Sequence, residues 1–197
     1  MNNLYIVVLV FFAFAKSGTA QSNQAAKLLD EVATKYESYE NVTFTYKGNF
    51  RNAKANIDTD LHGEAKLSGN KYNATYNGTT YMYDGKKLYT INREDEQVTI
   101  ATQNNDGSEM INPSNIMTFY QKGYNKELDI VQNVKGRKIQ YVKLKPIKSG
   151  SDYKSILLGI DVNTKHIYNT IITERSGTVI TFTLKSFKTN EPLPKNS

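Results

Sequence analysis

The order of apolar and polar residues predicts an export signal at the start of the chain. Residues 4–15 are apolar and carry no charge, and this run is shorter than the roughly 20 residues that a transmembrane helix needs. Small residues follow and end at Ala20, as at a signal-peptidase cleavage site. We therefore expect residues 1–20 to be a cleaved signal peptide and residues 21–197 to form one domain. Because no Lys or Arg precedes the apolar run, a buried core helix is the alternative.

An amphipathic helix is expected next, ending before Asn41. Either Ser22 or Asn23 can cap its first turn. Glu31 lies four residues before Lys35, which is a favourable spacing for an ion pair on a helix. The apolar side chains recur at helical intervals and therefore share one face. They are Ala25, Leu28, Leu29, Val32, Tyr36 and Tyr39.

From Val42 onward, apolar residues alternate with polar ones, which predicts β-strands. Pairs such as Asn-Gly and Asp-Gly, which favour tight hairpin turns, separate the runs. The expected turns lie at residues 69–70, 77–78, 84–85, 106–107, 163–164 and 176–177. Asn112 and Pro113 are suited to open a helix, so a short helix is expected over residues 113–121. Strands are then expected at residues 127–133, 138–145, 153–163, 166–174 and 178–187.

These elements predict a mainly β fold with helices, of the α+β class. The expected architecture is an antiparallel sheet that curls around the helices. The composition agrees with this expectation, because the 14 Tyr residues and absent Trp favour pleated, half-buried surfaces. Apolar residues make up 39% of the chain and charged residues 22%, which is typical of a globular domain.

Cysteine is absent from the chain, which excludes disulfides, thiolate zinc sites and cysteine nucleophiles. An exported protein without cysteine fits the bacterial periplasm better than a disulfide-stapled secreted domain. The formal net charge is +6. Its densest part is residues 135–148, where basic residues alternate with apolar ones, as on a strand with a solvated outer face. A docking patch for an anionic surface is the alternative, and nucleic acid is not expected as a partner.

The sequence contains no catalytic motif. Asn56, Asp58 and Asp60 begin like a calcium loop, but Leu61 replaces the glycine that its sharp turn requires. The carboxylates at residues 94–96 fall in an expected hairpin turn, where they are solvated. His62 and His166 lie far apart without neighbouring ligand residues and are expected at the surface. We therefore expect no enzyme activity, no cofactor and no metal.

Apolar surface is in excess on the strands expected over residues 72–91. Aromatic and aliphatic side chains occupy both faces there. A sheet of this kind either forms an ordinary core with tyrosine hydroxyls at its rim or lines a cavity for an apolar ligand. Both interpretations stay open on composition alone.

Several motifs together resemble the LolA-type outer-membrane lipoprotein carriers. The helix with Leu28, Leu29 and Val32 is followed by an alternating strand from residue 42 and by the Gly-Glu-Ala-Lys-Leu run of residues 63–67. The strongest element is Tyr-Asp-Gly-Lys-Lys-Leu-Tyr at residues 83–89, similar to the family's Asp-Gly-Lys hairpin, and Pro113 opens the next short segment. The resemblance covers residues 22–192 and suggests a member of the kind found in Bacteroidetes.

The resemblance implies an incomplete antiparallel β-barrel over a helical lid that closes an apolar cavity. It also implies a monomeric periplasmic carrier, without cofactor, that takes the acyl chains of lipoproteins from an inner-membrane ABC-type exporter to an outer-membrane acceptor. Such transport is physically needed, since each exposed methylene costs about 0.8 kcal/mol. The expected cavity residues are Leu29, Val32, Phe44, Tyr46, Leu67, Tyr72, Tyr83, Leu88, Ile91, Ile116, Met117 and Tyr120.

Two departures from the family pattern affect these expectations. The arginine that helps to latch the lid in proteobacterial members has no equivalent at residues 68–71, and Lys71 or Arg51 is only a loose substitute. The family's final Phe-x-Phe strand has no match before Ser197, so a more open barrel or a truncated chain is expected. A periplasmic sensor or lipid- and protein-binding module on the same half-barrel is the alternative function. An exported hydrolase that uses the carboxylates of residues 94–96 is a third, weaker one.

Overall fold

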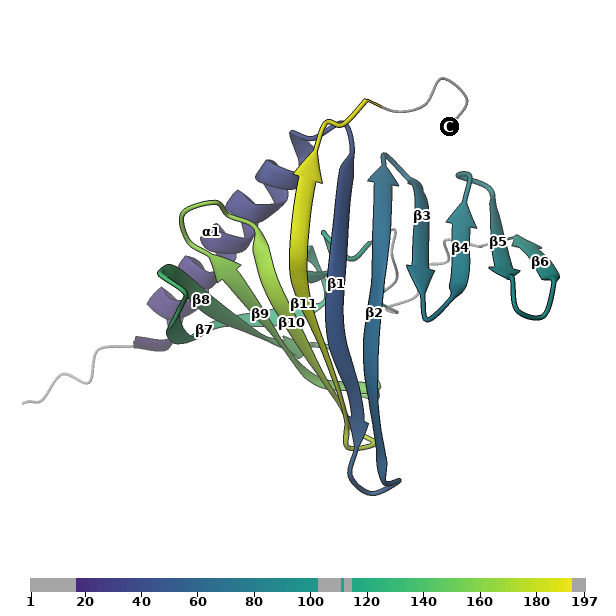
Figure 1. Ribbon diagram of the computed structural model, residues 1–197. Helices are drawn as coiled ribbons and strands as arrows, with labels where there is room; N and C mark the ends of the chain where they lie inside the picture. Colours follow the sequence, from purple (N-terminus) through teal and green to yellow (C-terminus); the bar gives the residue numbers. More distant parts are fainter. Residues whose placement is uncertain (1–16, 103–110, 112–114, 193–197) are drawn as a thin grey trace, which may run out of the picture.

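In the part of the chain that it describes, the computed structural model shows one antiparallel sheet and one α-helix (Figure 1). The structure describes residues 17–102, 111 and 115–192. The helix is α1 (Ser17–Glu37), and a short 3-10 helix, η1 (Phe119–Gln121), precedes β7. The strands are β1 (Val42–Asn52), β2 (Ile57–Ser68), β3 (Lys71–Tyr76), β4 (Thr79–Tyr83), β5 (Lys87–Asn92), β6 (Gln97–Thr102), β7 (Tyr124–Val134), β8 (Arg137–Pro146), β9 (Tyr153–Asp161), β10 (Ile167–Glu174) and β11 (Thr178–Thr189).

The sheet consists of two meanders joined through β1 and β11. The spatial order is β6-β5-β4-β3-β2-β1-β11-β10-β9-β8-β7, so that almost every strand pairs with its neighbour in sequence. The exception is the long pairing of β1 with β11, which runs from Val42 opposite Thr189 to Asn52 opposite Thr178. Strands β6 and β7 form the two edges of the described sheet, which is therefore open rather than a closed barrel.

The two faces of the sheet are distinguished by burial. Successive side chains of a strand point to opposite faces, and the buried residues of neighbouring strands are in register. We call the face that carries them the inner face. It includes Val42, Leu67, Tyr72 and Tyr83, which follow one another across β1 to β4. Figure 1 shows α1 on one side of the sheet, behind the half that contains β8 to β11.

Helix α1 packs its apolar stripe against the inner face. Ala25, Leu29 and Val32 are almost completely buried and belong to one cluster with the inner residues of β8, β9 and β10. These strand residues are Val142, Leu144, Ile156, Leu158, Ile160 and Ile172. The helical period predicted from the sequence is thus confirmed, because each member of the stripe that was expected to face the core is buried or packs on the core cluster.

Two local predictions about helices are wrong. Helix α1 begins at Ser17 and continues through Ser22 and Asn23, which therefore do not cap it. The helix expected at residues 113–121 is absent in its described part, where residues 115–118 form turns and only η1 is helical. Gly123, at φ 85°, ends this segment. So short a segment gains too few hydrogen bonds to offset the entropy of nucleating an α-helix.

The predicted strands agree closely with the observed ones. Strands β7 to β11 overlap all five ranges expected in the second half, and β9 ends two residues before residue 163. Turns occur at the expected positions 69–70, 77–78, 84–85, 163–164 and 176–177. The expected turn at residues 106–107, the apolar segment 4–15 and the residues after 192 lie outside the described part of the chain. Among the described residues, no helix combines the length and the apolar character that crossing a membrane requires.

Candidate ligand-binding cavity

An apolar cavity lies between the inner face of the sheet and Ile111, Ile116 and Met117, which belong to the connection between β6 and β7. Its volume is about 260 Å³. The central strands β1, β10 and β11 supply most of its wall, and three residues of the connecting segment cover it. The lining residues are Phe44, Tyr46, Ala65, Ala74, Ile111, Ile116, Met117, Tyr153, Ile167, Asn169, Thr170, Ile172, Glu174, Ile180, Phe182 and Leu184.

Tyr46 shapes one side of the cavity because a glycine lies beneath it. Gly63 is directly opposite Tyr46 on β2, and a Cβ atom at Gly63 would lie 2.6 Å from the Tyr46 hydroxyl oxygen. The ring therefore lies across β2, where its hydroxyl donates a hydrogen bond to the carbonyl oxygen of Thr75 at 3.2 Å. Burial raises the pKa of Tyr46 to about 12, so it stays neutral. Its ring also meets that of Phe182 edge to face, with centroids 5.6 Å apart.

The described residues of this connection contact the sheet at two points. The backbone N–H of Ile111 donates to the hydroxyl oxygen of Tyr153 at 3.3 Å. Met117 is buried in the core cluster, and Ile116 is half-buried beside it. The next turn, η1, places Tyr120 in the core, where burial raises the pKa of its hydroxyl. This oxygen has no hydrogen-bond partner among the described residues.

Polar contacts hold α1 and the residues just after it to the β9–β10 turn and to the first residue of β10. Lys165 Nζ lies 2.7 Å from Glu31 Oε2. The hydroxyl of Tyr36 accepts a hydrogen bond from the backbone N–H of Ile167 at 3.2 Å. The hydroxyl of Tyr39 lies 2.8 Å from His166 Nε2. The rings of Tyr36, Tyr39, His166 and Phe187 pack together around these contacts.

The twelve cavity residues expected from the sequence fall into four groups. Phe44, Tyr46, Ile116 and Met117 line the cavity. Leu29, Val32, Tyr72, Tyr83 and Tyr120 are buried in the adjoining core, where the rings of Tyr72 and Tyr83 lie 5.6 Å apart. Leu67 and Leu88 are half-buried against that core, and Ile91 lies on the other face of the sheet. Leu67 also borders a neighbouring hollow together with Met117.

Ile91 lies on the outer face because Leu88, on the same strand, faces inward. Leu88 pairs with Tyr83 on the inner face, and Ile91 is three positions further along β5. An odd separation in a strand places two side chains on opposite faces. The pairing of Ile91 with Val98 on β6 agrees with this placement, since Val98 is 60% exposed.

Sequence reasoning missed the part of the wall that β10 and β11 contribute. These residues alternate with threonines, as in Ile180-Thr181-Phe182-Thr183-Leu184. The period of two was visible and identified the strands. It did not show that β11 pairs with β1, which brings Phe182 and Leu184 beside Tyr46.

The other candidate chemistry is dispersed. His62 is exposed on β2, and residues 94–96 form the exposed turn between β5 and β6. Asp58 pairs with Arg51 at 4.0 Å and accepts a hydrogen bond from Asn49 on the neighbouring strand. His166 is not a free surface residue as expected, since it packs against Phe187 and Tyr39. The described residues contain no group of three or more His, Cys, Asp or Glu able to hold a metal ion.

The basic stretch of residues 135–148 forms β8 and its flanking turns. Lys135, Arg137, Lys138, Lys145 and Lys148 are exposed, and Lys143 is half-buried. Lys145 Nζ pairs with Glu127 at 3.0 Å, and the Arg137 guanidinium lies 4.9 Å from the centre of the Tyr168 ring. The alternation thus reflects a strand with a solvated, partly paired charged side, as expected.

Comparison with known proteins gives a family and a fold. A family model described as outer membrane lipoprotein carrier protein LolA matches residues 74–197. No curated protein sequence matches. An uncharacterised conserved protein from Thermus thermophilus has a similar structure, with a TM-score of 0.58 and 11% identity over 88% of this chain and 96% of that one.

Two further structures are similar. The Mycobacterium tuberculosis lipoprotein LppX has a TM-score of 0.54 at 11% identity, over 87% of this chain and 98% of that one. A proposed outer membrane lipoprotein-sorting protein domain from Vibrio parahaemolyticus has a TM-score of 0.50 at 10% identity, over 89% of this chain and 96% of that one. At such low identity these likenesses establish the shared fold.

Proposed function

Because this chain belongs to the LolA family of outer membrane lipoprotein carrier proteins, we propose that it binds the acyl chains of lipoproteins and carries them across the periplasm to the outer membrane. In this proposal residues 1–20 are a signal peptide and residues 21–197 are the mature domain. The protein acts as a monomer and as a carrier rather than as an enzyme. An inner-membrane ABC-type exporter supplies the cargo, and an outer-membrane acceptor receives it.

The apolar cavity is the observation that carries the proposal. Its wall is built from aliphatic and aromatic side chains of the inner face, with very few polar groups among the described lining residues. An acyl chain gains about 0.8 kcal/mol for each methylene that leaves water, so a wall of this kind favours acyl ligands. Polar substrates find few hydrogen-bond partners in it.

The size of the cavity implies that it opens to take its cargo. About 260 Å³ is close to the lower end of the range of roughly 300–1,000 Å³ found for small-molecule sites, and a lipoprotein anchor with several acyl chains is larger than that. We propose that α1, Ile111 and residues 115–121 form a lid that moves away from the inner face. The contacts of Glu31 and Tyr39 with Lys165 and His166 of the β9–β10 turn then take the place of the arginine latch of related carriers.

The alternative is a periplasmic sensor or binding module that uses the same half-barrel. The apolar cavity is compatible with such a role, and no observation favours it over transport. The two differ in what the protein releases, because a carrier transfers bound lipoprotein to a membrane acceptor and a sensor does not.

The direct test is binding by the purified mature protein. We expect it to increase the fluorescence of N-phenyl-naphthylamine and to keep a triacylated lipoprotein soluble without detergent. Ala65 is buried and lines the cavity, so Ala65→Phe fills the cavity and is expected to abolish both effects. Lys66→Phe, one residue along on the exposed outer face of β2, is the matched control. If the wild-type protein binds neither the probe nor the lipoprotein, the proposed function is wrong.

A further inference from the structure

One charged side chain lines the apolar cavity. Among the described lining residues, Glu174 is the only one that is charged at neutral pH. It is half-buried at the last position of β10, and the exposed turn of residues 175–177 follows it. The carboxylate therefore stands where the apolar wall meets solvent, at the end of the cavity near the β10–β11 turn.

The register of the sheet places Glu174 on the inner face. Ile172, two residues earlier, is buried there, and side chains two apart share a face. A register shift after Thr173 brings Tyr153 opposite Glu174. Tyr153 also lines the cavity and accepts the hydrogen bond from the Ile111 backbone, so Glu174 stands beside the point where the covering segment meets the sheet.

The carboxylate of Glu174 has unused capacity to accept hydrogen bonds. Within the described part of the chain, its only hydrogen bond comes from the hydroxyl of Ser176, which lies 3.0 Å from Oε2. That hydroxyl is also 2.8 Å from the Thr178 hydroxyl oxygen, and its single hydrogen can serve only one of the two. An ionised carboxylate offers about four acceptor sites, so most of them remain available to a ligand.

Nearby cationic side chains do not neutralise Glu174. Arg175 donates its Nε–H to the carbonyl oxygen of Ser151 at 2.8 Å, and the Lys54 chain lies against Gly177. Neither forms an ion pair with Glu174 among the residues that the structure describes. The mouth of the cavity therefore keeps a local negative charge on a protein whose formal net charge is +6.

We propose that Glu174 makes the cavity selective for acyl ligands whose polar end carries a protonated amine. This inference rests on the proposed binding of acyl chains and adds the chemistry of the headgroup. With the chain in the cavity, the ammonium lies at the mouth and donates a charge-assisted hydrogen bond to the carboxylate. A fatty-acid carboxylate in the same place is repelled, and an alcohol gains only a neutral donor.

Competition between three ligands of equal chain length tests the proposal. In this experiment tetradecylamine, tetradecanol and tetradecanoate are each added to the wild-type protein with bound N-phenyl-naphthylamine. The measurement is made at neutral pH and below the micellar concentration of each ligand, and it gives the concentration that displaces the probe. We expect the amine to act at about tenfold lower concentration than the alcohol, as one charge-assisted hydrogen bond implies, and the fatty acid to be the weakest. A protein of positive net charge attracts anions non-specifically, so this order has the opposite sign to a bulk charge effect.

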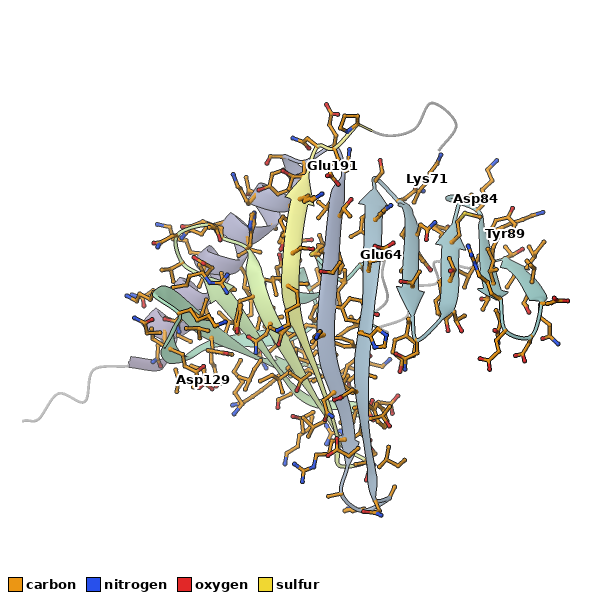
Figure 2. All side chains as sticks on the ribbon, viewed as in Figure 1. Glu64, Lys71, Asp84, Tyr89, Asp129 and Glu191 are labelled. Atoms are coloured by element: carbon orange, nitrogen blue, oxygen red, sulfur yellow. The ribbon has the colours of Figure 1, made fainter. Side chains whose placement is uncertain are left out.

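Two variants of Glu174 and one control variant locate the effect. Glu174→Gln removes the charge with little change of shape and is expected to make the amine and the alcohol about equal. Glu174→Asp keeps the charge and is expected to retain part of the preference, which also covers the case in which the glutamine variant does not fold. Glu64→Gln removes a carboxylate from the exposed outer face of β2, where Figure 2 shows Glu64 in front of the sheet, on the side away from α1. It is expected to keep the wild-type ratio.

The outcomes separate this inference from the proposed function. If tetradecanol and tetradecylamine displace the probe equally from the wild-type protein, acyl binding stands and the role of Glu174 is wrong. If Glu174→Gln still prefers the amine over the alcohol, acyl binding also stands and the role of Glu174 is wrong. If none of the three ligands displaces the probe, the role of Glu174 is wrong. The proposed function is overturned with it if the protein also binds neither the probe nor a triacylated lipoprotein.

A second pair of ligands identifies the source of the amine. A diacylated lipopeptide with a free α-amino group and its N-acylated triacyl form differ in the ammonium and in one acyl chain. Tighter binding of the diacylated form that disappears in Glu174→Gln assigns the site to lipoprotein N-termini. If short-chain phosphatidylethanolamine alone shows the dependence on Glu174, the amine belongs to a phospholipid headgroup.

Discussion

The hydroxyl of Tyr39 lies 2.8 Å from Nε2 of His166, and this contact joins the residues after α1 to the start of β10. Tyr36, one helical turn earlier, accepts a hydrogen bond from the residue that follows His166. The helix therefore meets the sheet through an aromatic cluster at one end. The ion pair of Glu31 with Lys165 adds a second polar contact, with the turn that precedes β10.

His166 is expected to make stability depend on pH. Its pKa is lowered by burial, and further by the charge of Lys35, while Asp161 acts in the opposite direction. Because the unfolded imidazole has a pKa of about 6.5, the unfolded state takes up the proton first as the pH falls. The contribution of His166 is fully present above that value and is lost as the pH falls through the lower folded pKa.

Urea unfolding from about pH 7.5 to pH 5 measures this contribution. The free energy of unfolding is expected to fall less in His166→Gln than in the wild-type protein. His62 is the matched control, because it is the other histidine and is exposed; His62→Gln should follow the wild-type curve. Identical curves for all three proteins would show that His166 is not linked to folding.

Charge reversal is expected to show that Lys165 and Glu31 act as a pair. Their atoms lie 2.7 Å apart, and the hydrogen bond from Lys165 is the main cause of the lowered pKa of Glu31. Lys165→Glu is expected to cost about 0.2–1 kcal/mol of unfolding free energy, as for partly exposed ion pairs. Adding Glu31→Lys should restore most of the loss in a double-mutant cycle, and additive losses would contradict the pairing.

Gly159 is expected to be intolerant of a side chain because Asn169 occupies the space above it. A Cβ at Gly159 would overlap Asn169 Oδ1 and lie 3.0 Å from the Tyr141 ring. Gly159→Ala is therefore expected to destabilise the protein by about 1–3 kcal/mol through overpacking. In an Asn169→Ala background the same change should cost clearly less, as measured by thermal unfolding. An equal cost in both backgrounds would show that the side chains of Tyr141 and Ile139, not Asn169, limit the site.

Met117 and Tyr83 are expected to respond differently to the introduction of a charge. Met117 lines the cavity, whereas Tyr83 packs on Tyr72 within the core. Met117→Lys should weaken binding of N-phenyl-naphthylamine by more than it lowers the melting temperature. Tyr83→Lys should mainly lower the melting temperature, because it buries an unpaired charge. Equal loss of binding at unchanged stability in both variants would place Tyr83 in the ligand site.

Strand β6 is expected to promote self-association of the protein. It is an edge of the described sheet, and Val98 and Ile100 are 60% and 57% exposed on it. Exposed apolar edge strands are aggregation sites, and a charge on them is protective. Val98→Lys should raise the concentration at which light scattering appears, without changing the melting temperature. This change does not touch the turn between β4 and β5, where the Tyr89 hydroxyl lies 3.1 Å from Asp84 Oδ2 (Figure 2).

The strands and the face of α1 were predictable because both depend on local periodicity. Alternation from Val42 onward and turn dipeptides such as Asn77-Gly78 are properties of short segments, and they located nearly every described strand. The stripe of α1 followed from its helical spacing. The segment before β7 was not predictable in the same way, because spacing alone does not show whether a short apolar run forms an α-helix or turns.

The sequence by itself thus determined that the protein is an antiparallel β fold with one amphipathic helix and surplus apolar surface. Only the tertiary structure decided which part of that surface lines a cavity. The pairing of β1 with β11 brings Phe182 and Glu174 to the same inner face as Phe44, across more than half of the chain. Periodicity assigns a side chain to a face of its own strand, whereas neighbours across a sheet depend on register between distant segments. For that reason sequence reasoning does not identify Glu174. The grouping of Ile91 with Leu88 was a different error, because their odd separation on β5 already places them on opposite faces.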